Sequence, residues 1–442
     1  MMKRVLVLGA GMVAKPFVEE MLNQGFKTTC VDVDLERAQS MLDDHPNANT
    51  LGKALSADLR DQETLDQLIQ DSDLVTSLLP PPFHPSIAKR CLANKKNLIT
   101  TSYMSPEMQS MSDEAAKAGL LFLNETGLDP GIDHMTVMTL KDEVLADGGK
   151  IVGFQSHCGG FPARKSATNP IRYKFSWNPR GVLGALERDS AYIINNQEFQ
   201  VPGRDMLSKS QPILIHGEGI YETTPNGNGA LYAKKYGLHD CRSVQRGTLR
   251  YPGWARFWSF VQENGWLDQE KKIECNGLTP IELFRKLSPW DESQGFMDYL
   301  YASKKLQASY FLEVFNSLDF FKEDERLHGS YSAFDFFLEK AQKNWMYGKG
   351  EADKVILYNQ FEVEKDGATK YWTLLLSQEG IPNGTSAMSL LVGLPCAIGA
   401  TLMLNGKIDL KGVHISLKKE IYRPILEGLK AKGVRFEKRI HS

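Results

Sequence analysis

The sequence predicts an α/β fold in which a doubly wound parallel sheet is joined to a second, α+β domain that carries a small helical insertion. Short apolar runs alternate with helical patterns over the first ~125 residues, as expected for βαβ units. From about Gly131, turns that contain Gly and Pro become frequent, which is typical of strands joined by long loops. Residues from about 255 to 345 place apolar side chains at helical spacing.

The first part of the chain has the clearest strand and helix patterns. Strands are expected at residues 4–8, 28–33, 73–79, 97–101 and 120–124, and helices at residues 13–23, 85–93 and 106–118. Right-handed crossovers place the carboxyl ends of parallel strands along one edge of a sheet. A ligand of this part is therefore expected at that edge.

Composition and charge exclude several classes of protein. The 52 basic and 54 acidic side chains give a formal net charge of −2, and no basic block is present, which argues against a nucleic-acid partner. The six cysteines form no CxxC pair, so neither a disulfide framework nor a metal site is expected. An apolar strand so close to Met1 leaves no room for a signal peptide, and we expect a cytoplasmic protein.

The segment Ala387–Leu404 has 18 residues and no charge, which is the lower limit for a helix that spans a membrane. Gly393, Pro395 and Thr401 lower its hydrophobicity, and the chain contains no second segment of this kind. We therefore expect a close-packed buried helix and no membrane partner.

A glycine motif follows the first strand. Residues 9–14 read GAGMVA, a GxGxxA pattern between a strand and a helix. Gly9 allows a tight turn, Gly11 lets the backbone approach a pyrophosphate, and Ala14 permits close helix packing. This context predicts dinucleotide binding, and the alternative is a glycine-rich turn that binds nothing.

Asp32 ends the second strand, where its carboxylate can accept hydrogen bonds from a ribose diol and would repel a 2′-phosphate. It favours NAD over NADP unless Arg37 or Lys53 offsets the repulsion. The alternative is an acid that caps the next helix.

Polar residues gather at the other predicted strand ends. Leu79 opens the sequence LPPPFHP, which predicts an extended loop beside the nicotinamide or a rigid turn into a helix capped by His84. Thr100–Tyr103 and Asn124–His134 add hydroxyl, carboxylate and imidazole groups. Asp129 precedes a proline and is expected either to point into the site or to cap the following helix.

Two later clusters carry further candidates. His157 and Cys158 are neighbours in a predicted strand and face opposite sides, so a Cys–His nucleophile is disfavoured and a polar contact with substrate is expected. Arg246, Thr248 and Arg250 suit the recognition of a carboxylate, and the alternative is that these arginines lie on the surface.

Several motifs occur together and in the same order as in one known family. They read VLVLGAGMVAKP, LLPPPFHP, TTSYMSP, NETGLDPGIDH, GGKIVGFQSHCGGFPA, NPIRYKFSWNPRGVL, RGTLRYPG and VGLPCAIGATLMLNGKI. The chain resembles the saccharopine dehydrogenase family, and most of all its glutamate-forming branch. The resemblance runs from Lys3 to about Val434 and is weakest over the helical insertion.

The resemblance implies the domain organisation and the reaction. A Rossmann domain would comprise residues 1–130 and 386–442, an α+β substrate and dimerisation domain residues 131–254 and 346–385, and the helical insertion residues 255–345. The implied reaction, part of lysine metabolism, is the reversible reduction by NAD or NADP of the imine formed from L-glutamate and 2-aminoadipate 6-semialdehyde. A homodimer is expected.

The resemblance also assigns site residues. Those expected to bind the cofactor, together with the strand-end residues Asp32 and Leu79, are Gly9, Gly11, Met12, Val13, Ser176 and Trp177. Those expected to bind the substrate are Ser102, Tyr103, Asp129, Thr248, Leu249 and Arg250. Asp129, Tyr103 and His157 are the expected catalytic residues.

Two positions depart from the family pattern. Asp32 stands where an arginine-type residue of the fungal enzymes suits NADP. Residues 225–229 read PNGNG where a family loop contributes an arginine to a substrate carboxylate, and the loss of such a bond costs about 1.5–3 kcal/mol. Two alternatives therefore stand beside the implied reaction: another imine reductase such as a carboxy-polyamine dehydrogenase, and a non-catalytic nucleotide-sensing protein.

Overall fold

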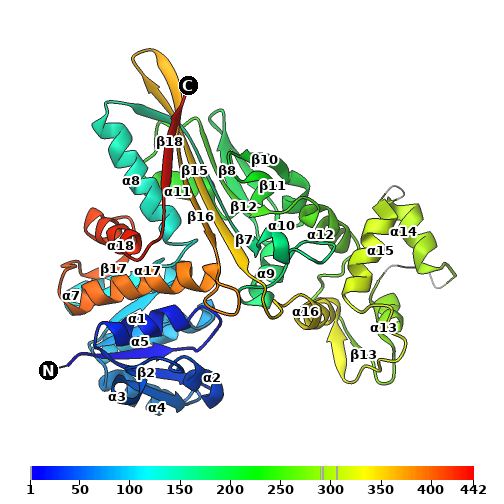
Figure 1. The fold of residues 1–442 in the computed structure, drawn as a ribbon, viewed down its shortest axis with the longest axis horizontal. Coiled ribbons are helices and arrows are strands. Elements are labelled where there is room, and N and C mark those ends of the chain that lie inside the picture. Colours follow the sequence, from blue (N-terminus) through cyan, green and yellow to red (C-terminus); the bar gives the residue numbers. More distant parts are fainter. Residues whose placement is uncertain (1, 289, 291–292, 305–306) are drawn as a thin grey trace. The chain divides into compact units, whose positions relative to one another are not determined.

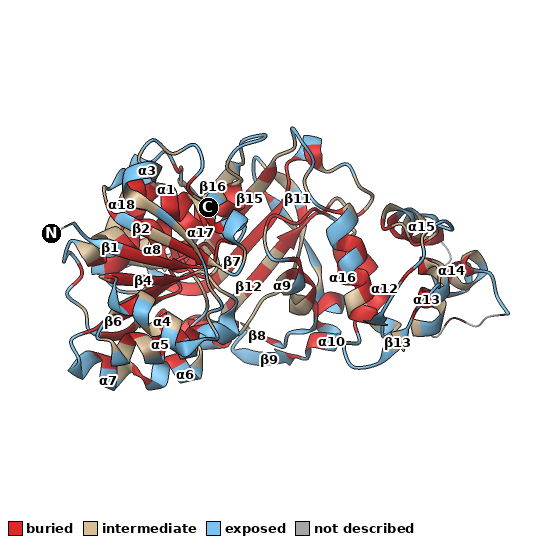
Figure 2. Cartoon of the chain, turned by 90° about the horizontal axis from the view of Figure 1, so that it is seen from below, coloured by how far each residue is buried: buried red, intermediate tan, exposed pale blue. Residues whose placement is uncertain are grey.

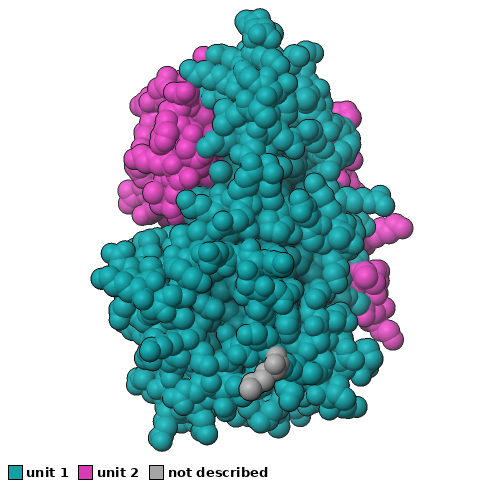
Figure 3. Space-filling view, turned by 90° about the vertical axis from the view of Figure 1, so that its left-hand side faces the viewer, with its two compact units in different colours: residues 1–152, 359–380, 384–442 teal, residues 153–358, 381–383 magenta. Residues whose placement is uncertain are grey.

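The computed structural model describes residues 2–288, 290, 293–304 and 307–442 (Figure 1). These residues divide into two compact units (Figure 3). Unit 1 comprises Met1–Val152, Asn359–Gly380 and Gly384–Ser442, and unit 2 comprises Gly153–Tyr358 and Ile381–Asn383. The division falls within two long strands, β7 (Lys150–Pro162) and β15 (Asp353–Lys365).

The sheet at the centre of unit 1 has seven strands and is entirely parallel. Its order in space is β17-β6-β5-β4-β1-β2-β3. The strands are β1 (Arg4–Leu8), β2 (Lys27–Asp32), β3 (Gly52–Ser56), β4 (Leu74–Ser77), β5 (Asn97–Thr100), β6 (Leu121–Asn124) and β17 (Gly412–Ile415). The strand order reverses between β1 and β4, which confirms the predicted doubly wound sheet.

The helices of unit 1 pack on this sheet or on one another, as α18 does on α17 and α8 does on α18. They are α1 (Lys15–Asn23), α2 (Leu35–Ser40), α3 (Ala48–Leu51), α4 (Gln62–Gln70), α5 (His84–Ala93), α6 (Pro106–Ser110), α7 (Ser112–Lys117), α8 (Ile132–Ala146), α17 (Ala387–Leu404) and α18 (Lys419–Ala431). The single helix expected over residues 106–118 is two helices, separated at Met111. The strands beneath are mostly buried (Figure 2).

Helix α17 is the uncharged segment of the sequence, and by length and mean hydropathy it is the described helix that could cross a membrane. Of its residues, 67% are buried. The helix packs against α1, beside which it lies in Figure 1. At Gly393 an added Cβ would lie 2.8 Å from the carbonyl oxygen of Val13. The predicted close packing is therefore present, since only glycine permits this approach.

The observed units differ from the expected domain limits. Residues 131–152 belong to unit 1, because α8 packs against α18. Residues 359–380 also belong to unit 1, where Asn359 donates a hydrogen bond to Thr136 of α8 at 2.7 Å. The expected helical insertion forms part of unit 2.

Strands β7 and β15 belong to a mixed sheet of nine strands, in which β8–β12 come from unit 2 and β16 and β18 come from unit 1. The order is β10-β11-β12-β7-β15-β16-β18, and β8 pairs with β12 and with β9. The additional strands are β8 (Ser190–Ile194), β9 (Gln197–Val201), β10 (Gln211–Ile215), β11 (Gly219–Pro225), β12 (Ser243–Arg250), β16 (Ala368–Glu379) and β18 (Glu437–His441). Strands β13 (Lys272–Glu274) and β14 (Ser330–Ser332) form a separate pair.

The helical part of unit 2 is held together by aromatic rings. Its helices are α9 (Pro179–Gly184), α10 (Gly203–Met206), α11 (Gly229–Lys235), α12 (Trp254–Glu263), α13 (Pro280–Leu287), α14 (Phe296–Lys304), α15 (Ala308–Ser317) and α16 (Ala333–Asn344). Rings from α12, α15 and α16, among them Trp258, Phe315 and Phe337, are fully buried and contact one another. The aromatic residues at helical spacing are thus core residues.

The close approach of α17 to α1 can be tested with two helical glycines. We expect Gly393→Ala to lower the free energy of unfolding by about 1–2 kcal/mol, because the new methyl group meets backbone atoms that cannot move independently. Gly428→Ala in α18 is the matched control. There the new Cβ meets only the side chain of Ile398, and alanine favours the helix by about 1 kcal/mol. Urea denaturation of both variants checks the prediction, and equal losses would contradict it.

Candidate functional site

The glycine loop after β1 passes close to the loop after β4. Gly9 has φ +98° and donates its N–H to the carbonyl oxygen of Val31 at 2.8 Å. An added Cβ at Gly9 would lie 3.2 Å from the backbone of Leu78 and from the side chain of Leu79. The positive φ and this contact both require glycine, and the contact places Leu79 beside the glycine loop.

The loop fits the pyrophosphate of a dinucleotide. An added Cβ at Gly11 would meet nothing within 4 Å, so the space above this residue is open. Met12 is 46% exposed and Val13 is half-buried, whereas Ala14 is fully buried at the start of α1. The open space therefore lies at the N-terminus of a helix, where backbone N–H groups and the helix dipole favour a phosphate.

The carboxylate of Asp32 fixes the glycine loop by a hydrogen bond to its backbone. One carboxylate oxygen accepts the N–H of Ala10 at 2.8 Å, and the other accepts the N–H of Asp34 at 3.1 Å. The alternative role as a helix cap is wrong, because Asp34 is the residue that caps α2, accepting the N–H groups of Glu36 and Arg37. Arg37 also forms an ion pair with Asp34 at 3.3 Å.

Tyr103 and Asp129 form a pair at the ends of β5 and β6. The Tyr103 hydroxyl donates a hydrogen bond to the carboxylate of Asp129 at 2.6 Å. Tyr103 is 40% exposed and Asp129 is half-buried, so both can be reached by a ligand. Asp129 does not cap the following helix: the N-cap of α8 is Gly131, without a side-chain hydrogen bond. The structure thus brings together two of the three expected catalytic residues.

A buried pair that the sequence analysis did not assign holds the loop that carries Tyr103. Glu125 is fully buried with φ +55°, and its carboxylate binds the N–H of Met104 at 3.0 Å and Nε2 of His134 at 2.7 Å. The N–H of Glu125 also binds the carbonyl oxygen of Ser102 at 3.1 Å. Two ionisable residues within the motif NETGLDPGIDH were the available signal, but nothing in the sequence shows that they meet.

A second set of hydrogen bonds reaches the same loop from the other side. His84 is buried and bonds to Ser77 through Nδ1 at 2.9 Å and to Ser102 through Nε2 at 2.7 Å. The expected capping role of His84 is wrong: the N-cap of α5 is Phe83, with no side-chain hydrogen bond. Ser102, an expected substrate-binding residue, is therefore fixed by a histidine.

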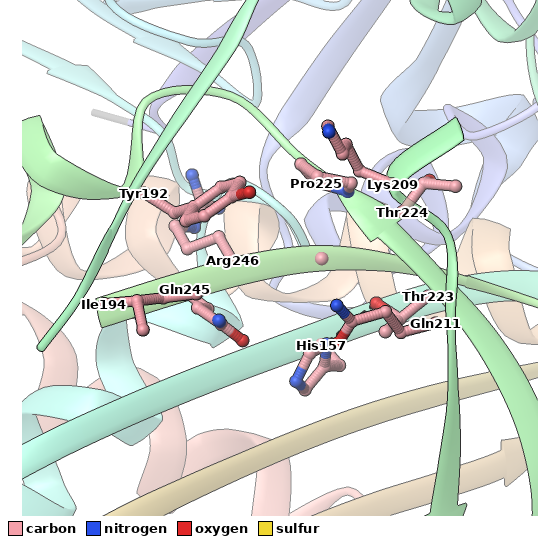
Figure 4. A pocket seen from close by; sticks show the side chains of 11 residues that line it. His157, Tyr192, Ile194, Lys209, Gln211, Thr223, Thr224, Pro225, Gln245 and Arg246 are labelled. Atoms are coloured by element: carbon pink, nitrogen blue, oxygen red, sulfur yellow. Dashed lines mark hydrogen bonds between the residues drawn. The ribbon is translucent and has the colours of Figure 1, made fainter. Parts of the chain in front are cut away.

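His157 lies in unit 2, where it lines a small polar pocket (Figure 4). Its Nδ1 contacts the Thr223 hydroxyl at 2.9 Å and its Nε2 contacts the Oε1 atom of Gln155 at 3.3 Å. Since Oε1 only accepts, Nε2 carries the hydrogen and Nδ1 accepts from Thr223. Burial lowers the pKa of His157 to about 4, so the imidazole is neutral near pH 7.

The pocket around His157 is small, with a volume of about 40 Å³, and it is partly open to solvent. Besides His157 and Thr223, the side chains of Arg246, Lys209 and Gln211 lie around it. His157 and Cys158 occupy successive positions of β7, so they face opposite sides of the sheet as predicted.

The two arginines of β12 are buried, so the alternative that they lie on the surface is wrong. Arg246 is 4% exposed and stacks over the ring of Tyr232, and Arg250 is 8% exposed between Tyr173 and Trp254.

The residues between these arginines alternate along β12. Thr248 is half-buried, whereas the side chain of Leu249 is fully buried on the opposite face of the strand. Leu249 can therefore contact a ligand only through its backbone.

The other expected cofactor residues of unit 2 precede α9. Ser176 is buried, and Trp177 is half-buried with its ring over the first turn of α9. An added Cβ at Gly181 would lie 2.8 Å from this ring, so the tryptophan packs there because Gly181 has no side chain. Within the described parts of the chain, no group of three His, Cys, Asp or Glu side chains is arranged to hold a metal ion.

The expected site residues thus fall into two sets. Unit 1 holds the glycine loop, Asp32, Leu79, Ser102, Tyr103 and Asp129, all at the carboxyl ends of β1, β2, β4, β5 and β6. Unit 2 holds His157, Ser176, Trp177 and the segment 248–250. Figure 3 shows the extent of the two units.

Comparison with protein families identifies both parts of the chain. Residues 5–123 match the family model described as the saccharopine dehydrogenase NADP binding domain. Residues 127–434 match the model described as the saccharopine dehydrogenase C-terminal domain.

Individual relatives match over nearly the whole chain. Saccharopine dehydrogenase [NADP(+), L-glutamate-forming] of Schizosaccharomyces pombe is 30% identical over 99% of both chains, and the Saccharomyces cerevisiae protein of the same name is 33% identical over 97% of both. The mitochondrial alpha-aminoadipic semialdehyde synthase of Bos taurus is 34% identical over 98% of this chain and 47% of its own length. The solved structure of the apo S. cerevisiae saccharopine dehydrogenase (L-Glu forming) covers all of both chains with a TM-score of 0.88 and 31% identity.

The depressed pKa of His157 makes stability depend on pH. Between its usual pKa of 6.5 and the folded value of about 4, the unfolded chain binds a proton that the folded chain does not. His157 therefore lowers the free energy of unfolding as the pH falls through this range, by up to about 1.4 kcal/mol per pH unit. Glutamine is neutral at every pH. We therefore expect the free energy of unfolding of His157→Gln to fall less steeply with decreasing pH, by this amount.

Chemical denaturation of both proteins between pH 7 and pH 4 provides the measurement. Because every other titrating group is present in both, the difference in slope belongs to His157. Parallel curves would show that His157 titrates normally in the folded protein.

Proposed function

The chain belongs to the saccharopine dehydrogenase family of oxidoreductases, and from this premise we propose that it oxidises saccharopine to L-glutamate and 2-aminoadipate 6-semialdehyde in a reversible reaction. The observation that carries the proposal is the match, over nearly the full length of both chains, to relatives named as L-glutamate-forming saccharopine dehydrogenases. The geometry at the carboxyl edge of the unit 1 sheet supports it.

The reaction makes few demands on the protein. Saccharopine loses a hydride from the carbon next to its secondary amine and a proton from the nitrogen, which leaves an imine. Water then adds to the imine carbon, and the C–N bond breaks to release the amino acid and the aldehyde. A bound nicotinamide supplies the hydride acceptor, and Gly9, Gly11, Met12 and Val13 would hold the pyrophosphate of that dinucleotide.

Asp129 and Tyr103 are the best-placed groups for the proton transfers. A carboxylate at this position stabilises the positive charge of a protonated imine, and it can accept the amine proton before hydride leaves. The 2.6 Å hydrogen bond from Tyr103 orients this carboxylate and connects it to an exposed hydroxyl. His157 is less suited to donate a proton near neutral pH, because its pKa is about 4 and its nitrogens contact Thr223 and Gln155.

Arg250 is our candidate for the residue that binds a carboxylate of the substrate. Its guanidinium is buried between two aromatic rings, and Nη1 donates a hydrogen bond to the carbonyl oxygen of Leu249 at 2.7 Å. A guanidinium in this surrounding is weakly solvated, which strengthens a bond to a carboxylate. We further propose that the protein works as a homodimer in the cytoplasm, which light scattering and cell fractionation would check.

The first experiment is a spectrophotometric assay of saccharopine oxidation with NAD and with NADP. We expect turnover, and in the reverse direction a dependence on L-glutamate together with the semialdehyde. The reverse assay should include a panel of amines, because Gly227 brings no charged side chain to the loop after β11. Dependence on a diamine instead of glutamate would indicate a carboxy-polyamine dehydrogenase, and dinucleotide binding without any turnover would indicate a nucleotide sensor.

The role of Asp129 can be separated from cofactor binding. We expect Asp129→Asn to lower kcat by about 100-fold or more, the usual size of a lost acid–base group, with an unchanged dissociation constant for the dinucleotide. Tyr103→Phe should cause a smaller loss of kcat, because the carboxylate remains. Tyr371→Phe is the matched control, since Tyr371 has the same exposure at 39% and lies in β16. Unchanged turnover in Asp129→Asn would remove this residue from the mechanism.

Asp32 leads us to propose a preference for NAD, although the matched domain is described as NADP-binding. Its carboxylate lies at the end of β2, where it accepts the N–H of Asp34, and the nearby cation Arg37 is already paired with the Asp34 carboxylate. We expect Asp32→Asn, which can still accept the Ala10 bond, to raise the ratio of kcat/KM for NADP over NAD about tenfold by relieving charge repulsion. Asp61→Asn, which changes the cap of α4, is the control. A wild-type preference for NADP would refute the proposal, and a ratio that Asp32→Asn leaves unchanged would show that Asp32 does not set the preference.

A further inference from the structure

Three polar side chains form a continuous hydrogen-bonded chain at the carboxyl edge of the unit 1 sheet. Ser77 is the last residue of β4, His84 is the first residue of α5, and Ser102 follows β5. The Ser77 Oγ–His84 Nδ1 distance is 2.9 Å, and the His84 Nε2–Ser102 Oγ distance is 2.7 Å. Ser77 is fully buried and His84 is 3% exposed, whereas Ser102 is only half-buried.

The short proline-rich loop after β4 brings His84 back to the strand ends. Prolines at positions 80–82 restrict the backbone and donate no N–H, and they lead through a single 3₁₀ turn, Pro81–Phe83, into α5. Because this loop is short, α5 begins with His84 close to the end of β4. Its side chain points to β4 and β5, as its bonds to Ser77 and Ser102 show.

The imidazole of His84 has one donor nitrogen and one acceptor nitrogen. Burial lowers its pKa to about 4, so the ring is neutral near pH 7. It must then donate to one serine and accept from the other. The direction of these hydrogen bonds consequently decides whether Ser102 has a hydrogen available for a ligand or can offer only lone pairs.

The burial of Ser77 sets this direction. Its hydroxyl is fully buried, and among the described residues the structure gives it one side-chain partner, Nδ1 of His84. A buried O–H without an acceptor is strongly unfavourable, so Ser77 donates to Nδ1. Nε2 then carries the ring hydrogen and donates to the oxygen of Ser102.

The surroundings of Nε2 agree with this assignment. A second oxygen, Oγ1 of Thr100, lies 3.5 Å from Nε2 and also accepts the N–H of Ser102 at 3.3 Å. One ring N–H directed between two oxygens satisfies both of them. If Nε2 were the acceptor, Ser102 would have to turn its hydrogen toward the ring, and Thr100 would receive no hydrogen from His84.

We propose that His84 is a positioning residue that holds the Ser102 hydroxyl as a hydrogen-bond donor for a carboxylate of the substrate. Because Ser102 accepts from Nε2, its own hydrogen points away from the ring. A hydroxyl fixed in this way directs its hydrogen to an anionic oxygen, whereas a Ser102 hydroxyl that donated to Nε2 would offer a ligand only lone pairs. The proposal rests on the proposed function, since it takes the substrate to be an amino acid with carboxylates.

The direction of the hydrogen bonds from Ser77 through His84 to Ser102 can be measured without any turnover. Nitrogen-15 NMR of the histidine-labelled protein distinguishes a protonated ring nitrogen from an unprotonated one, and His84→Gln identifies the signals by their loss. We expect His84 to carry its hydrogen on Nε2. A hydrogen on Nδ1 would reverse the chain and overturn the proposal, whatever the activity of the protein.

The link to substrate is tested with four variants: His84→Leu, His84→Gln, Ser102→Ala and the double variant His84→Leu/Ser102→Ala. We expect His84→Leu to raise the KM for saccharopine about tenfold, the effect of losing one oriented bond to a charged group, with an unchanged KM for the dinucleotide. His84→Gln should restore most of the wild-type KM, because an amide can accept from Ser77 and donate to Ser102. In the Ser102→Ala background, His84→Leu should have little further effect.

A merely structural role for His84 would give a different pattern. The effects of His84→Leu and Ser102→Ala would then multiply, and glutamine would be no better than leucine. If His84→Leu does not fold, Ser77→Ala gives the same test by removing only the partner of Nδ1, and Ser72→Ala, another buried serine, is its control. A wild-type protein that does not oxidise saccharopine would refute the proposed function, and the NMR result would still decide the direction of the chain.

Discussion

All seven strands of the unit 1 sheet run in the same direction, and this constraint determines where every polar group of that unit lies. Neighbouring strands are about 4.8 Å apart, so the loops that leave β1, β4, β5 and β6 must lie side by side. Residues far apart in the sequence, such as Asp32, Ser77, Ser102 and Asp129, therefore share one edge. A mixed sheet would send half of these loops to the opposite edge.

The loops at this edge are fixed mainly by buried polar contacts. The segment 102–104 is held on one side by His84 and on the other by Glu125, which also binds His134. Burying any of these groups without a partner would be unfavourable, so their hydrogen bonds are retained. These bonds restrict the segment 102–104 to one conformation. Tyr103 and Asp129 can be half-exposed and still well oriented, because the residues beneath them are not exposed at all.

Much of this arrangement follows from local patterns in the sequence. Strands β1, β2, β4, β5 and β6 are apolar runs, and their order along the chain was sufficient to predict the sheet and its functional edge. Strand β3 was missed because it is only half-buried and has no apolar run. The contacts of the site were not predictable, since Asp32 meets Ala10 across 22 positions and Asp129 meets Tyr103 across 26. The contacts of His84 and Glu125 were missed for the same reason: His84 was expected to cap a helix and Glu125 was given no role, and only the fold shows what they touch.

The last sixth of the chain has a consequence for how the protein matures. Strand β17 pairs with β6 at the border of the parallel sheet, and α17 covers α1, although more than 250 residues separate these partners. During synthesis the amino-terminal half of unit 1 leaves the ribosome with this apolar surface uncovered, and it must wait for the final segments. Unit 2 is almost complete by then. Unit 1 therefore begins first on the ribosome and is completed last.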